Sequence, residues 1–248
     1  MNKLMLCSAA AIMGIAPTVS AIDLGDTVVV SYNSTATLGR TVDWNYDSAR
    51  AFDSTSITGT SNLALAGLFT FDVIAGGTIQ AFCVEVAENF PDDPITYDVT
   101  EPSLVPEESP PGPMGDTRLS LVKDLYANFY DDAVTGDGDT SYGNTADEAA
   151  AFQLVLWEIT HENFTGSTAS QMKDQMFIEK GAFAITSFAN SNILGIANNM
   201  IAALGSGSAF ELFGFSNPTN QDLLVVVPSP AIAGLAGLGL AGMRRRRR

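Results

Sequence analysis

Two side chains that could take part in chemistry lie in segments that the neighbouring residues predict to be buried. Cys83 lies within "IQAFCVEV" (79–86), an apolar run typical of a buried strand. Gln153 lies within "AAAFQLVLWEI" (149–159), a helical pattern that is apolar on every face except at Gln153 and Glu158. A cysteine thiol is a nucleophile once ionised, and a buried carboxamide left without a hydrogen-bond partner costs about 1–3 kcal/mol. Gln153 therefore requires a specific neighbour.

Residues 1–21 contain the other cysteine of the chain, Cys7, and are expected to be removed on export. Lys3, the apolar run that follows it and the small residues before position 22 are typical of a secretory signal, with cleavage expected after Ala21. The other cysteine, Cys7, is removed with that signal. Cys83 would then stand alone in a compartment where thiols are usually oxidised or paired.

The C-terminal residues 223–248 are typical of a second targeting signal. An apolar stretch over 231–243 leads to five arginines, Arg244 to Arg248, after a short motif made of Pro228, Ser229 and Pro230. The stretch is short for a full span, but together with the preceding "LLVVV" or in a thinned bilayer it could insert. The arginines would stay cytoplasmic. The alternative is a basic tail that binds anionic surfaces.

This C-terminal pattern resembles the PEP-CTERM sorting signal, which exosortase-type transpeptidases recognise. Ser229 stands where that family usually has glutamate. The resemblance implies an exosortase-type partner, transient or permanent anchoring in the membrane through the C-terminal segment, and a final place in the cell envelope, on the outer surface or outside the cell.

Charge excludes one class of function. Six of the twelve basic residues lie in the two terminal signals, so the remaining chain carries six basic against 28 acidic residues, a net charge of about −22. Nucleic-acid binding is excluded because phosphate contacts need clustered cations. The composition suits a solvated extracellular protein.

Spacing of apolar residues predicts strands before and after a helical region. The expected strands cover 27–34, 68–75, 79–86, 95–100, 209–215 and 223–227, with a hairpin across Gly76-Gly77. A Pro-rich loop precedes an amphipathic helix over 116–133, and Thr145 with Glu148 forms a capping box for a second helix through Glu162. One or two more helices are expected over 170–205. We therefore expect an α+β fold over 22–222, a β-sandwich or barrel with a helical insertion at about 116–204.

The segments "FCVEV" and "AFQLVLWE" resemble the two motifs of the thioester domains of bacterial surface adhesins. In that family a cysteine thiol and a glutamine side chain condense, with loss of ammonia, into an internal thioester. The resemblance implies a bond between Cys83 Sγ and Gln153 Cδ, with Phe82 and Trp157 as the flanking aromatic residues. It departs from the family at Phe152, where threonine is frequent.

The resemblance implies single-turnover covalent adhesion and not a turnover enzyme. An amine or hydroxyl of a target, such as a lysine or a polysaccharide, would take the acyl group and free the thiol. One alternative is a structural biofilm or matrix protein in which Cys83 is an unreactive core residue and Gln153 bonds to backbone. Another is a secreted hydrolase or calcium-dependent binding module.

His161 is a candidate to assist acyl transfer. It lies eight residues after Gln153 and four after Trp157, so we expect all three on one helix face. There the imidazole could act as a general base. The alternative is an interaction with the helix dipole.

An acidic loop before the second helix suggests Ca²⁺ as the one cofactor to consider. The first, third, fifth and twelfth positions of a calcium loop would be Asp137, Asp139, Ser141 and Glu148. Tyr142 stands where such a loop requires glycine, so an acidic turn without metal is the default interpretation.

Overall fold

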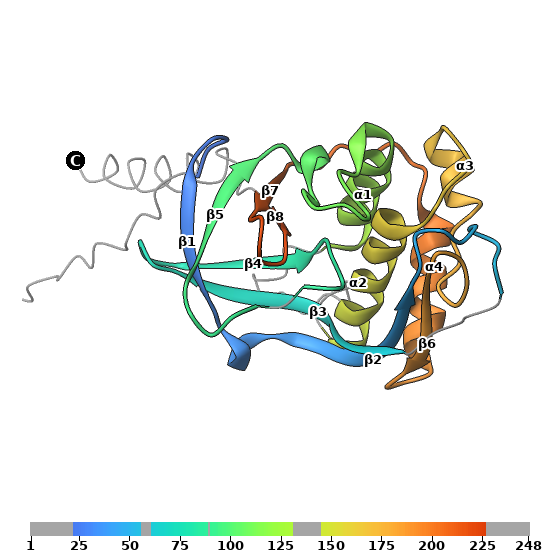
Figure 1. Ribbon diagram of the computed structural model, residues 1–248, viewed down its shortest axis with the longest axis horizontal. Coiled ribbons are helices and arrows are strands. Elements are labelled where there is room, and N and C mark those ends of the chain that lie inside the picture. Colours follow the sequence, from blue (N-terminus) through green and yellow to red (C-terminus); the bar gives the residue numbers. More distant parts are fainter. Residues whose placement is uncertain (1–21, 56–60, 89, 131–144, 227–248) are drawn as a thin grey trace, which may run out of the picture.

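A computed structural model describes residues 22–55, 61–88, 90–130 and 145–226. The barrel occupies one half of the molecule and the helices the other (Figure 1). The strands are β1 (Thr27–Tyr32), β2 (Leu38–Tyr46), β3 (Asn62–Val73), β4 (Thr78–Cys83), β5 (Ile95–Thr100), β6 (Phe183–Phe188), β7 (Leu212–Ser216) and β8 (Leu223–Val226). The helices are α1 (Gly115–Phe129), α2 (Ala146–His161), α3 (Ala169–Lys173) and α4 (Asn192–Ala203), with short 3₁₀ turns η1 (Ser34–Ala36) and η2 (Pro102–Leu104).

Six antiparallel strands close the barrel in the order β1-β5-β7-β8-β4-β3, and β3 pairs back onto β1 through Val30 and Val73. The twelve-residue β3 serves two sheets. Its first part pairs with β2, as far as Leu38 opposite Leu68, and its last part pairs with β4, beginning with Phe69 opposite Ala81. β2 and β6 thus extend the sheet toward the helices. Of the two expected architectures, the barrel with a helical lobe is the one observed.

The hairpin predicted across Gly76-Gly77 is confirmed. β3 and β4 pair from Asp72 opposite Thr78 onward, and both glycines have positive φ, 112° and 90°. A Cβ at either position would force the backbone out of this turn. The hairpin sets the register that places Cys83 at the last position of β4.

Helix α2 begins as predicted, with the reciprocal capping box between Thr145 and Glu148. Every residue from Ala149 to His161 is buried, because α2 packs against β2, β3, α1 and α4. In Figure 1 it lies near the centre, with the barrel strands to its left, α1 above it and α4 to its right. A helix enclosed on all sides can bring its polar residues only to protein groups.

Two boundaries differ from the prediction. The region 170–205, expected to be helical, contains β6, which pairs with β2 through Trp44 opposite Ile185. The domain does not end at 222, because β8 pairs with β4 through Cys83 opposite Leu223 and Ala81 opposite Val225. The first four residues of "LLVVV" therefore complete the barrel, as their strand propensity predicted, and do not begin a membrane segment.

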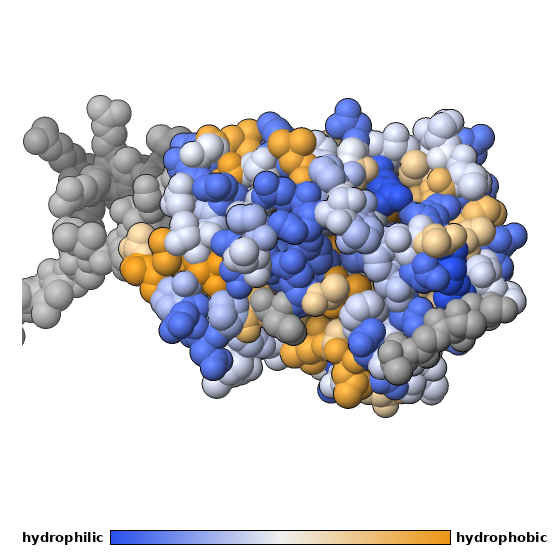
Figure 2. Space-filling model, in the orientation of Figure 1, coloured by the Kyte–Doolittle hydropathy of each residue, from blue (hydrophilic) through white to orange (hydrophobic). Residues whose placement is uncertain are grey.

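The surface in Figure 2 is polar over much of the visible face, with apolar groups between. Leu63 on β3 and Ile74 after it are exposed. Among the described residues no helix is long and apolar enough to cross a membrane. The predicted signal at 1–21 and residues 227–248 of the predicted C-terminal signal, including Pro228, Ser229 and Pro230, lie outside the described residues.

Candidate functional site

The structure brings Gln153 of α2 against Cys83 of β4, seventy residues earlier in the chain. Both residues are fully buried, at 0% exposure. The backbone N–H of Cys83 donates to Gln153 Oε1 at 3.0 Å, and Gln153 Nε2 donates to the Cys83 carbonyl at 2.7 Å. One residue therefore supplies partners for both ends of the carboxamide.

The pairing has a cause in the strand ladder. β4 pairs with β3 only as far as Ala81, which lies opposite Phe69. The residues of β3 that precede Phe69 pair with β2 instead. On the other side of β4, the N–H of Val84 donates to the Asp222 carbonyl at 2.9 Å. Successive residues of a strand direct their backbone groups to opposite edges, so Cys83 faces the edge that β3 has left. The Gln153 carboxamide takes the place of the missing peptide group there.

Two more residues of α2 hold the chain that follows Cys83. Trp157 Nε1 donates to the Glu85 carbonyl at 2.9 Å, and Thr160 Oγ1 donates to the Val84 carbonyl at 3.1 Å. With Gln153 they follow one another at spacings of four and three, which defines one helix face. Together they fix the backbone of 83–85.

An aromatic cluster is formed by the chain neighbours of the pair. Phe82 and Phe152, the residues before Cys83 and Gln153, stack with ring centroids 4.3 Å apart. Tyr126 of α1 meets the Phe152 ring edge-on at 4.9 Å. Each of these three side chains is at most 1% exposed. Phe82 thus lies beside the pair, while Trp157 acts on the backbone two residues beyond Cys83.

Burial raises the pKa of the Cys83 thiol well above its ordinary value, and the carboxyl of Glu85 adds to the effect. The thiol is therefore neutral at neutral pH. Burial also raises the pKa of Glu85 to about 8, since hydrogen bonding from the Asp222 backbone offsets only part of it. Glu85 was not predicted as a site residue. The available signal was a lone charged residue in the apolar run 79–86.

His161 lies elsewhere. Its ring packs on Tyr46 of β2 at 5.0 Å and on Phe183 of β6 at 5.6 Å. Burial lowers the imidazole pKa to about 3, so the ring carries no charge for the helix dipole. Nδ1 lies 2.8 Å from Thr160 Oγ1, and within the described chain no hydrogen bond joins His161 to Cys83 or Gln153. Thr160, and not His161, continues the face of Gln153.

The proposed calcium ligands fall into two groups. Asp137, Asp139 and Ser141 lie outside the described residues. The Glu148 carboxylate accepts from the Thr145 backbone at 3.2 Å and from its hydroxyl at 2.9 Å, so it caps α2. Over the ranges that the structure describes, no group of three or more His, Cys, Asp or Glu side chains is arranged to hold a metal ion.

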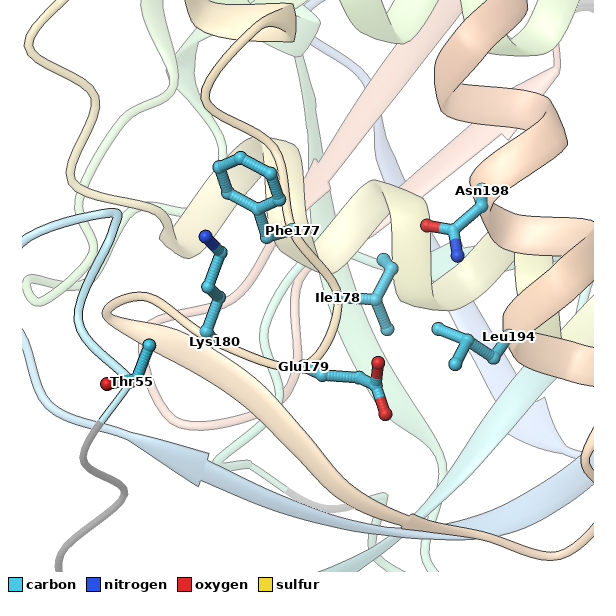
Figure 3. Close-up of a pocket in the computed structure, with 7 residues that line it drawn as sticks. All are labelled: Thr55, Phe177, Ile178, Glu179, Lys180, Leu194 and Asn198. Atoms are coloured by element: carbon cyan, nitrogen blue, oxygen red, sulfur yellow. The ribbon is translucent and has the colours of Figure 1, made fainter.

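A cavity of about 350 Å³ lies between the segment before β6 and α4. Lys180 and Phe177 both line the cavity, with Lys180 Nζ 3.6 Å from the centre of the Phe177 ring. Asn198 of α4 contributes its amide to the lining (Figure 3). None of its lining residues is among those predicted for chemistry.

Comparison with protein-family models, with curated proteins and with solved structures finds no match to this chain.

Proposed function

We propose that Cys83 and Gln153 form an internal thioester and that the protein uses it once, for covalent attachment to a target surface. The observation that carries the proposal is the pairing of the two residues in the interior: both polar atoms of the Gln153 side chain bond to Cys83 at 3.0 and 2.7 Å. No other cysteine among the described residues competes for the thiol.

The chemistry balances without a cofactor. The Cys83 thiol adds to Gln153 Cδ, and the amide nitrogen leaves as ammonia with the thiol proton. An incoming amine or hydroxyl then takes the acyl group, which forms an amide or ester at Gln153 and returns the thiol. The Cys83 N–H that donates to Oε1 is placed to stabilise negative charge on that oxygen during both steps.

The surroundings suit a stored acyl donor. Both residues of the pair are fully buried, and the exclusion of water slows hydrolysis. Two of the three described lysines are already engaged: Lys173 Nζ donates to the carbonyls of Ala202 and Leu204 at 2.8 and 2.6 Å. Lys180 lies over the Phe177 ring.

Export and anchoring complete the proposal. The predicted signal at 1–21 and the PEP-CTERM-like end would carry the barrel to the cell envelope or beyond, with an exosortase-type enzyme and the membrane as partners before processing. A lysine amine or a polysaccharide hydroxyl on a neighbouring surface would be the target. In this role the protein is a single-use adhesin and not a turnover enzyme.

One observation favours a second candidate, a structural matrix protein with an inert core cysteine. Each polar atom of the Gln153 side chain has a hydrogen-bond partner, and the raised pKa of Cys83 keeps its thiol neutral. The same contacts would hold an unreacted glutamine at the edge of β4.

Intact mass distinguishes the two candidates. The protein from Ile22 to Val226, which includes β8, is purified without exposure to amines, beside Cys83→Ala. A wild-type mass lower by one ammonia, replaced by a methylamine adduct at Gln153 and absent in the variant, supports the thioester. A full mass with a thiol that alkylates in the unfolded protein assigns Cys83 to the core.

A further inference from the structure

The barrel ends very close to the predicted membrane segment. Strand β8 ends at Val226, and the apolar stretch 231–243 begins five residues later in the sequence. Five residues of extended chain reach at most about 17 Å, and the headgroup layer on one side of a bilayer is about 5–7 Å thick. With the stretch 231–243 in the membrane, the end of the barrel that contains Val226 therefore lies within about 10 Å of the headgroups.

The turn between β3 and β4 lies at the same end of the barrel. β8 runs antiparallel to β4, with Val225 opposite Ala81, so Val226 lies one step nearer to the start of β4 at Thr78. The turn at Gly76-Gly77 precedes Thr78 and extends about 10 Å beyond the level of Val226, at about 3.3 Å per residue. Figure 1 shows this turn at the end of the barrel remote from the helices. The β3–β4 turn therefore projects to the side on which the chain leaves β8.

The β3–β4 turn has exposed apolar residues and no charge. Residues 74–78 are all exposed, and the sequence has no charged residue from Val73 to Val84. Ile74 is 61% exposed, and its backbone N–H donates at 2.9 Å to the carbonyl of Val29 on β1, which is 36% exposed. Two exposed aliphatic residues are thus neighbours beside an uncharged turn. Turns that face only water are usually polar, and neighbouring exposed apolar residues favour an interaction surface.

Charge restricts the kind of lipid that this surface fits. The exported part of the chain has an expected net charge of about −22, so anionic headgroups repel it. Asp72, the last charged residue before the turn, accepts from Asn33 Nδ2 at 3.2 Å. The contact is therefore apolar in nature and suits neutral lipid.

We propose that the β3–β4 turn is the membrane contact of the anchored protein, with Ile74 and Val29 among the headgroups of neutral lipid; this inference rests on the anchoring in the proposed function. The turn and the chain after Val226 hold the barrel at two points and so fix its orientation. Cys83 is the last residue of β4, at the end opposite the turn. It then faces away from the membrane, together with Gln153 of α2, toward a target on another surface.

The experiment locates two fluorescent labels on the exported chain, residues 22–248, in phosphatidylcholine vesicles. Ile74→Cys and Leu63→Cys are each made in Cys83→Ala, so that one thiol carries the label. Leu63 is the matched control, because it is 72% exposed on the same strand and eleven residues before Ile74, about 36 Å along the strand. Brominated acyl chains quench a label at the apolar edge of the bilayer. The expected result is a loss of emission at position 74, none at position 63, and a smaller loss at position 74 when anionic lipid is added.

Flotation of the vesicles verifies that the chain is anchored, and thermal unfolding verifies that each labelled variant is folded. A chain that floats with an unquenched label at position 74 overturns this inference alone. Equal quenching at both positions also overturns it, because the barrel then has no fixed face toward the membrane. A label at position 74 that is shielded before lipid is added assigns the turn to contact with a second copy of the chain and again overturns it. A chain that does not float overturns the anchoring as well, while the intact-mass test of the thioester stands by itself.

Discussion

Helix α2 contains two polar residues that the sequence marks as exceptions, and the fold treats them differently. Gln153 has both side-chain atoms bonded to one residue of β4. Glu158 accepts from the Phe177 N–H at 2.8 Å through one oxygen, while its other oxygen is buried without a partner among the described residues. Burial raises the pKa of Glu158 well above its ordinary value, which favours the protonated, neutral carboxyl. One site is complementary to its partner and the other is an incompletely satisfied core position.

The largest loss of stability is expected on substitution of Gln153, and its absence would remove the contrast with Glu158. Gln153→Leu keeps the volume but leaves the N–H and carbonyl of Cys83 buried without partners, each costing about 1–3 kcal/mol. We expect the free energy of unfolding to fall by about 3 kcal/mol in urea titration. The comparison is made on Cys83→Ala for both glutamine states, so that no thioester contributes. A loss below about 1 kcal/mol would mean that water or a shifted β3 replaces the carboxamide.

A smaller effect is expected from pH, through Glu85. Its carboxyl binds its proton more tightly in the folded protein, where the pKa is about 8, than in the unfolded chain, where it is 4.5. The stabilisation is therefore fully present below the unfolded pKa and is lost as pH rises through the folded one. Between about pH 6 and pH 9 it amounts to about 2–3 kcal/mol. Denaturant titrations at the two pH values measure it, and Glu85→Gln should remove most of the difference.

The smallest effect is expected at Glu158. Glu158→Gln replaces the carboxyl, whose raised pKa favours the neutral form, by a neutral amide of the same shape and keeps an acceptor for the Phe177 N–H. The free energy of unfolding should change by about 1 kcal/mol or less, measured at neutral pH in the same urea titration. A large loss would show that Glu158 is ionised in the folded protein and bonds through both oxygens. The contrast with Gln153 would then disappear.

Local chemistry explains which parts of this structure the sequence could predict. The Gly76-Gly77 hairpin and the Thr145 capping box depend on residues next to one another, and both were predicted. The need of Gln153 for a specific partner followed from burial on all faces of its helix. The strand β6 was missed because helix-forming residues surround it, and only its pairing with β2 makes it extended.

The remaining site contacts depend on tertiary geometry. That Cys83 faces an open edge follows from β3 leaving β4 for β2, which no local pattern encodes. The predicted orientation of His161 differs from the observed one. Thr160, one residue earlier on α2, faces Val84, and the His161 ring packs on Tyr46 and Phe183 instead. Nothing in the local sequence predicts the partner of Glu85. Its burial depends on the turn before β8, where the Asp222 N–H donates to Glu85 Oε2.

The pairing of β8 with β4 has a mechanical consequence. Leu223 lies opposite Cys83, and β8 ends at Val226, just before the predicted Pro-Ser-Pro motif. If that end is held in an envelope and a target is joined at Gln153, tension runs along the polypeptide from α2 through β6, α4 and β7 to β8. Strands β1 to β5 lie outside the stretched segment. Peeling β8 from its C-terminal end would separate Val225 from Ala81 first and Leu223 from Cys83 last, so pulling on the tether would act directly on the partner of the strand that carries the thiol.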